Sequence, residues 1–108
     1  MFKSAFIIMA PDGDPEKYRA TITTSKAELT AVIIEIMNFD QAVEVAKDLV
    51  QNQGVQSIYL CAGFTHQAVA RVAAAVGGRA AVQVARGDVP STLLAGDILT
   101  KEGWFDEG

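Results

Sequence analysis

The sequence has almost no cysteine, with Cys61 as the single one in 108 residues. One thiol cannot form a disulfide within the chain, and it cannot supply the cysteine cluster of a structural zinc site. Its scarcity excludes the disulfide-stapled domains that are common among small secreted proteins. Together with the lack of a signal-like or membrane-spanning run, described below, this predicts a cytoplasmic protein.

Cationic side chains are also few. Nine Lys and Arg stand against thirteen Asp and Glu, which gives a formal net charge of −4, and residues 48–70 contain no Lys or Arg. Proteins that bind nucleic acid usually gather basic residues into a patch, because contacts to phosphate supply most of their affinity. We expect no nucleic-acid partner.

Long hydrophobic runs are missing as well. The apolar stretch near the start of the chain ends at Pro11 and is too short for a signal sequence. No run approaches the ~18 residues that a membrane-spanning helix needs. We therefore expect no membrane partner.

The composition is that of a globular protein. Half of the residues are hydrophobic and a fifth are charged, both ordinary values for a compact domain. The length is close to the commonest domain size, and it allows a core without disulfides or metals. We predict a single domain over residues 1–108.

Short apolar runs bounded by turn residues predict the strands. They lie at residues 5–10, 29–37, 55–62 and 80–85. Residues 18–24 alternate in character, with Tyr18, Ala20 and Ile22 on one face, which predicts a half-exposed fifth strand.

Helical spacing of apolar residues predicts three helices. They lie at residues 39–53, at 65–76, and from Pro90 or Ser91 to Gly103. Asn38 and Thr65 suit the caps of the first two helices, and Gly54 suits the position after the first. In the last helix we expect Leu94, Ile98 and Leu99 to face inward.

Alternation of strands and helices along the second half predicts parallel strands joined by right-handed crossovers. The expected fold is an α/β, single-domain sandwich with a mostly parallel sheet of four or five strands and about three helices. We expect the first strand inside the sheet and residues 18–24 at an antiparallel edge. The strand order beyond that stays open.

Polar residues that could carry chemistry collect after the strands. In open parallel sheets, ligands bind beyond the carboxyl ends of the strands. Residues 38–40, 63–66 and 86–91 must lie at that edge, and 12–14 join them if the first strand is parallel to the others. This convergence is a fold-level argument, because many α/β proteins place polar residues there.

The strongest candidate in this set is Gly63-Phe64-Thr65-His66. Gly63 allows the backbone to turn or to approach a ligand, and the first turn of a helix offers N–H groups that attract anions. A neutral His66 could accept a proton, so His66 is our candidate catalytic residue. The alternative is an exposed histidine with no function beyond starting a helix.

Arg86, Asp88 and Asp12 complete the expected ligand-binding set with Gly63, Phe64 and Thr65. Arg86 could bind a carboxylate or phosphate through two parallel hydrogen bonds, or it could pair with Asp88 or Asp12. The expected ligand is a small anion.

Two other chemistries have weaker support. Cys61 and His66 could form a nucleophile–base pair, although a cysteine in a strand usually packs as a small hydrophobe. The Asp residues in turns could bind a divalent cation, but turns favour Asp for other reasons, so we expect no metal site. Gly77-Gly78 follows a helix, unlike a dinucleotide loop, and the cofactor stays unknown.

Two stretches resemble a known family. They are Cys61-Ala62-Gly63-Phe64-Thr65-His66-Gln67-Ala68-Val69 and Ala85-Arg86-Gly87-Asp88-Val89-Pro90. They are similar to small prokaryotic proteins grouped as domain-of-unknown-function family 6506, and the likeness extends over nearly the whole chain. The resemblance implies a compact α/β fold and no assigned activity. Gln67 stands where we would expect an acid in similar chains, and if that acid were a catalytic partner of the histidine, this chain would lack it.

Two functional hypotheses follow. In the first, the protein binds a small anionic metabolite at the carboxyl edge of the sheet, with His66 as proton carrier and Arg86 as anchor. In the second, it is a non-catalytic homodimeric interaction or structural module. Trp104, Phe105 and Phe2 would then supply an apolar patch, and Trp104→Ala would abolish the dimer.

Overall fold

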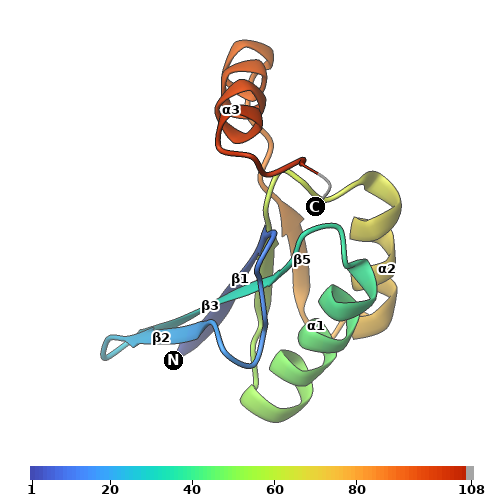
Figure 1. Cartoon of the computed structure of the whole chain (residues 1–108). Coiled ribbons are helices and arrows are strands. Elements are labelled where there is room, and N and C mark those ends of the chain that lie inside the picture. Colours follow the sequence, from blue (N-terminus) through green and yellow to red (C-terminus); the bar gives the residue numbers. More distant parts are fainter. Residues whose placement is uncertain (107–108) are drawn as a thin grey trace.

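Five strands form one sheet in the order β2-β3-β1-β4-β5, in a computed structural model that describes residues 1–106 (Figure 1). The strands are β1 (Phe2–Ala10), β2 (Arg19–Thr23), β3 (Ala27–Glu35), β4 (Ser57–Leu60) and β5 (Ala81–Val84). The helices are α1 (Phe39–Gln53), α2 (His66–Val76) and α3 (Val89–Lys101).

The topology agrees with the sequence-based expectation. β1 lies inside the sheet and pairs in parallel with β3 and β4, and β4 pairs in parallel with β5. β2 is antiparallel to β3 and forms one edge. The predicted α/β class, the mostly parallel sheet and the three helices are therefore confirmed.

The ends of α1 and α2 are set by short-range hydrogen bonds. The Asn38 side chain accepts from the Gln41 backbone N–H at 3.1 Å, and Thr65 Oγ1 accepts from the N–H three residues later at 3.1 Å. Gly54 follows α1 in the left-handed conformation at φ 72°. These caps are the predicted ones. The Gln41 side chain accepts a hydrogen bond from the Glu35 backbone N–H at 2.8 Å, which ties the end of β3 to the first turn of α1.

The hydrophobic core lies between one face of the sheet and the two helices α1 and α2, which lie side by side on that face (Figure 1). The largest fully buried side chains come from both layers. They are Phe64, Ile7, Ile34, Leu49, Ile58, Leu60, Val32, Val72 and Val76. Each contributes about 1.5–3 kcal/mol of transfer free energy when it leaves water.

The inward orientation expected for α3 is wrong. Leu94 is 61 % exposed and Ile98 is also exposed, only Leu99 is half-buried, and none of the residues described in α3 is fully buried. The helix stands above the carboxyl edge of the sheet, on the side away from α1 and α2 (Figure 1). Apolar side chains lie on more than one side of α3. The spacing of apolar residues in the sequence therefore predicted a helix correctly, but it could not show which face of the helix packs against the rest of the chain.

Within residues 1–106, no helix combines the length and the apolar character that crossing a bilayer requires.

Candidate functional site

The carboxyl ends of the four parallel strands meet at one edge of the sheet, as the sequence predicted. The strands end at Ala10, Glu35, Leu60 and Val84. Because β4 and β5 are neighbours, the loop that leads to His66 lies beside the loop that contains Arg86. The expected site residues are therefore brought to one edge, and the open question of strand order is resolved.

The turn between β4 and α2 is packed tightly against the core. Phe64 is only 1 % exposed, and its ring centroid lies 5.5 Å from that of Phe39. At Gly63, a Cβ atom would lie 2.6 Å from Cε of Met9, so the absence of a side chain permits this packing. Phe64 and Gly63 thus hold the turn against the hydrophobic core, and the polar residues that follow them are exposed to solvent.

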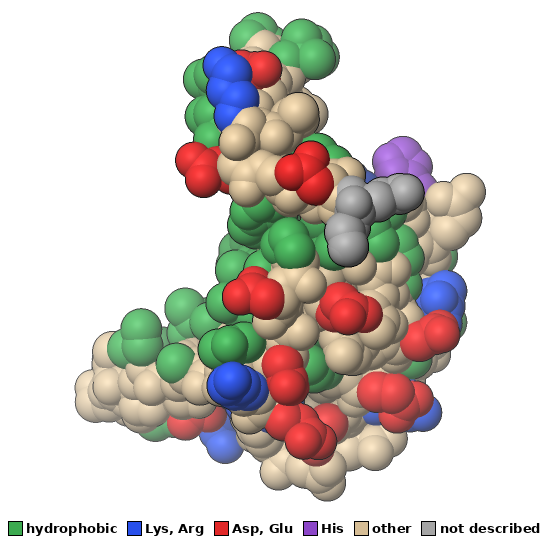
Figure 2. All heavy atoms as spheres, viewed as in Figure 1, with side chains coloured by type: hydrophobic (Ala, Val, Ile, Leu, Met, Phe, Trp, Pro, Cys, Tyr) green, Lys and Arg blue, Asp and Glu red, His purple; other side chains and the backbone are tan. Residues whose placement is uncertain are grey.

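Thr65 and His66 lie at the amino end of α2 and are exposed. Thr65 caps the helix, and His66 is its first residue. Figure 2 shows the histidine at the surface, near the carboxyl edge of the sheet. The first-turn N–H groups of a helix have no partners within the helix, so this end can accept an anion.

Arg86 is engaged with the backbone. Its Nη1 donates to the carbonyl of Ala62 and its Nη2 to the carbonyl of Phe64, both at 2.8 Å. In the described part of the chain, no ion pair joins Arg86 to Asp12 or Asp88. The guanidinium therefore joins the segment after β5 to the turn after β4. An anion that bound to Arg86 would compete with these two carbonyls for its N–H groups.

Asp88 caps α3. Its carboxylate accepts a hydrogen bond from the Ser91 backbone N–H at 2.7 Å, and this bond holds the pKa of Asp88 below its ordinary value. Asp12 is exposed in the turn after β1. The next residue must be glycine, since a Cβ at Gly13 would lie 1.9 Å from the carbonyl oxygen of Ile34.

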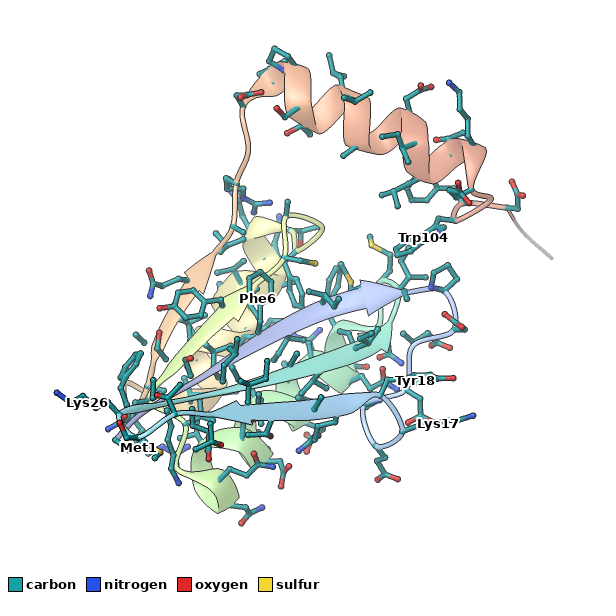
Figure 3. All side chains as sticks on the ribbon, turned by 90° about the vertical axis from the view of Figure 1, so that its left-hand side faces the viewer. Met1, Phe6, Lys17, Tyr18, Lys26 and Trp104 are labelled. Carbon is teal, nitrogen blue, oxygen red and sulfur yellow. The ribbon has the colours of Figure 1, made fainter. Side chains whose placement is uncertain are left out.

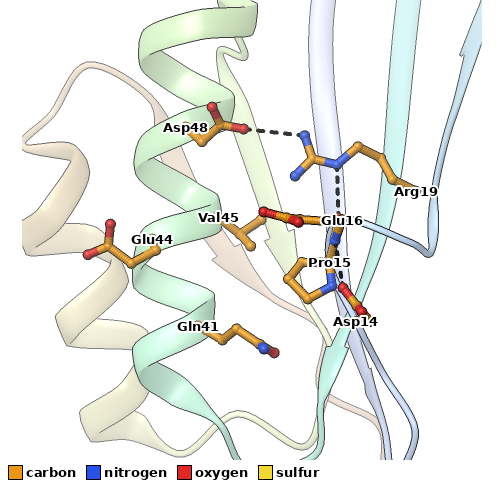
Figure 4. A pocket seen from close by; sticks show the side chains of 8 residues that line it. All are labelled: Asp14, Pro15, Glu16, Arg19, Gln41, Glu44, Val45 and Asp48. Carbon is orange, nitrogen blue, oxygen red and sulfur yellow. Dashed lines mark hydrogen bonds and ion pairs between the residues drawn. The ribbon is translucent and has the colours of Figure 1, made fainter.

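A groove that the sequence did not indicate lies between α1 and the β1–β2 connection (Figure 4). It has a volume of about 460 Å³. Its lining residues are Asp14, Pro15, Glu16, Arg19, Gln41, Glu44, Val45 and Asp48. The i,i+4 spacing of Glu44 and Asp48 was the only sign of this groove in the sequence, because it places both carboxylates on one face of α1. The opposite wall comes from residues 14–19, about thirty positions earlier in the chain.

One ion pair closes part of this groove. Arg19 Nη1 lies 3.3 Å from Asp48 Oδ2, and Arg19 Nε donates to the carbonyl of Pro15 at 3.2 Å. A hydrogen bond from Asn52, followed by the interaction with Arg19, holds the pKa of Asp48 below its ordinary value. Among the described residues, no group of three His, Cys, Asp or Glu is placed to hold a metal ion. The groove is thus an acidic surface with one internal cation.

The opposite face of the sheet is mostly apolar, and none of the described helices packs on it (Figure 3). We call it the open face. Alternation along paired strands assigns its residues. They are Phe2, Ser4, Phe6, Ile8, Ala10, Ala20, Ile22, Ala27, Leu29, Ala31, Ile33, Glu35, Ser57, Tyr59, Ala81 and Gln83.

The open face has its own packing. The rings of Phe6 and Tyr59 stack with centroids 6.3 Å apart. A shallow hollow of about 330 Å³ lies over β2 and β3, and its lining includes Tyr18, Ala20 and Ile33. Figure 2 shows hydrophobic side chains along the concave side between α3 and the β2–β3 hairpin. The nearly continuous apolar run at 29–37 indicated such a face in the sequence, because a strand with apolar residues on both faces is usually buried on both.

Comparison with known proteins gives one family. The model of a family of unknown function, DUF6506, matches residues 2–99. Neither the curated proteins nor the solved structures contain a match.

Proposed function

The chain belongs to DUF6506, a family of unknown function, and we therefore propose from geometry alone that it is a homodimeric interaction module. The observation that carries the proposal is the open face. Ile22 on this face is 68 % exposed, and Phe2, Ile8 and Leu29 are also exposed. Exposed apolar side chains that adjoin one another usually mark an interaction surface.

The sheet type supports the same proposal. All-parallel sheets occur almost only with both faces covered, because their crossover helices lie on both faces, and four of the five strands here are parallel. In this chain, β1 and β3 carry apolar residues on both faces, whereas α1 and α2 cover one face. A second layer on the open face would complete the arrangement, and a partner molecule can supply it.

A second copy of the chain is the partner that fits. The exposed apolar side chains of the open face and of α3 together carry on the order of 800 Å² per chain. A two-fold dimer that buried both sets would remove roughly 1,600 Å² from water, the size of a standard specific interface. Because each chain brings both surfaces, a symmetric dimer closes without leaving either one exposed.

The proposal is tested by placing a charge on the open face. Ile22→Lys should convert a dimeric wild type into a monomer in light scattering coupled to size exclusion, because an unpaired cation would be buried in the interface. Thr23→Lys is the matched control, since Thr23 is exposed on the same strand and points to the other face. A wild type that is monomeric throughout the micromolar range contradicts the proposal.

We also keep a small anion at the carboxyl strand edge as a second proposal. It is supported by the exposed position of His66 in the first turn of α2. His66 would donate to or accept from the ligand, and the first-turn N–H groups would bind it. The partial commitment of Arg86 to two carbonyls argues for a weak site. The cytoplasmic location stays a prediction from the single cysteine and from the lack of a signal-like or membrane-spanning run.

A thermal-shift screen tests this second proposal. Small carboxylates and phosphate are added to the wild type and to His66→Ala, because a ligand that prefers the native state raises its melting temperature. We expect stabilisation of the wild type that is lost in His66→Ala. An equal shift in both proteins would place the ligand elsewhere, and the acidic groove beside α1 would be the next surface to examine.

A further inference from the structure

Helix α3 is apolar on several sides yet exposed. Leu93 is 69 % exposed, and Leu94, Val89 and Ile98 are exposed as well. Leu93 and Leu94 are adjacent in sequence and project about 100° apart around the helix axis. A helix with apolar residues on several sides is normally buried between other elements. Its own chain provides no such burial in the part that the structure describes.

Both ends of α3 are attached to the carboxyl edge of the sheet. At the start, Arg86 fastens the preceding segment to the carbonyls of Ala62 and Phe64. At the end, the half-buried Trp104 lies beside the end of β1, and α3 passes across the edge between these points (Figure 3). In this arrangement, α3 does not lie on the open face of its own chain (Figure 3).

The dimensions of the helix and of the open face correspond. The 13 residues of α3 span about 20 Å at 1.5 Å per residue. The five strands span about 19 Å from edge to edge, at the usual spacing between neighbours. The charged residues of α3, Asp97 and Lys101, pair with each other at 3.0 Å. When α3 docks on an apolar surface, neither charge therefore needs a counter-ion from the partner chain.

We infer that two copies of this chain exchange α3, so that each helix packs on the open face of the other copy. The inference rests on the proposed homodimer and specifies its contacts. One chain supplies the unpartnered helix and the other the unpartnered sheet face, and the two-fold axis repeats the contact. The sheet then has helices on both faces, as parallel sheets generally do.

Charge complementation between two variants tests the exchange. One variant carries Ile22→Lys on the open face, and the other carries Leu94→Glu on α3. Each alone should have a dimer dissociation constant raised on the order of tenfold or more, because both contacts of its homodimer are disrupted. Mixed in equal amounts, they should form heterodimers with one native contact and one in which Glu meets Lys. Native mass spectrometry resolves the species.

A matched control and three outcomes make the test decisive. Thr92→Glu adds the same charge on the other side of α3 and should leave the dimer intact. If Leu94→Glu stays dimeric while Ile22→Lys is monomeric, the exchange is wrong and the homodimer stands. If both are monomeric and their mixture forms no heterodimer, the exchange is also wrong. A monomeric wild type refutes the homodimer and the exchange together. Circular dichroism of each variant verifies that it is folded.

Discussion

The two faces of the sheet are built from similar residues and have opposite environments. Ile7 and Ile8 are neighbours on β1, yet Ile7 is fully buried beneath the helices and Ile8 is 37 % exposed on the open face. Alternation along a strand sends successive side chains to opposite faces, so composition alone cannot distinguish them. The comparison teaches that a strand with apolar residues on both sides can complete one core and still leave a second surface to be covered.

The largest expected effect comes from truncating the same residue type on each face. Ile7→Ala should lower the free energy of unfolding by about 3 kcal/mol, because it leaves a cavity in a closed core. Ile8→Ala should cost less than about 1 kcal/mol when urea unfolding is measured in dilute protein. At high concentration its cost should increase, since the dimer then contributes to stability. Equal costs for both at every concentration would contradict the distinction between the faces.

A smaller effect is expected from Arg86, which fastens the segment before α3 to the carbonyls of Ala62 and Phe64. Arg86→Lys retains the charge but cannot bond both carbonyls at once, and it should cost about 1 kcal/mol of stability. Amide hydrogen exchange in residues 89–101 should become faster. Slower exchange in the variant would mean that the freed helix packs on its own sheet and that the observed attachment prevents it.

The smallest effect is a pH dependence of the α3 cap. The hydrogen bond from Ser91 lowers the pKa of Asp88 below the ordinary 3.8 in the folded chain. The cap therefore contributes fully above that ordinary value, and its contribution is lost as pH falls through the lower, folded-state pKa. Asp88→Asn should retain the cap without this dependence, which helix content between pH 5 and about 2 would measure. Identical profiles for both proteins would contradict the assignment.

The fold was predictable because local spacing and chain connectivity determine it. The change from the apolar run at 29–37 to helical spacing at 39–53 defined a strand and a helix, and the alternation of strands and helices predicted parallel strands, although not their order in the sheet. The caps at Asn38 and Thr65 were predictable for the same local reason. The packing of α3 was not predictable, because the spacing of apolar residues indicates a helix but does not show which surface buries them.

The position of the candidate site at the carboxyl edge of the sheet was predictable from the sequence, but the hydrogen-bond partners of its residues were not. Strand direction alone brings the loop with His66 beside the loop with Arg86. The partners of Arg86 are backbone carbonyls, which carry no residue-specific signal in a sequence. The ion pair of Arg19 with Asp48 joins residues 29 positions apart, and it depends on how β2 and α1 pack. Local patterns contain no information about such pairs.

The central position of β1 has a consequence for synthesis of the chain. β1 is made before β4, one of its two neighbours, because β4 begins only at Ser57. Ile7 is paired in register with Leu60, so the middle of the sheet cannot close until the chain through Leu60 has left the ribosome. Until then β1 has an unpaired edge, and a nascent chain paused before β4 exposes that edge to other chains.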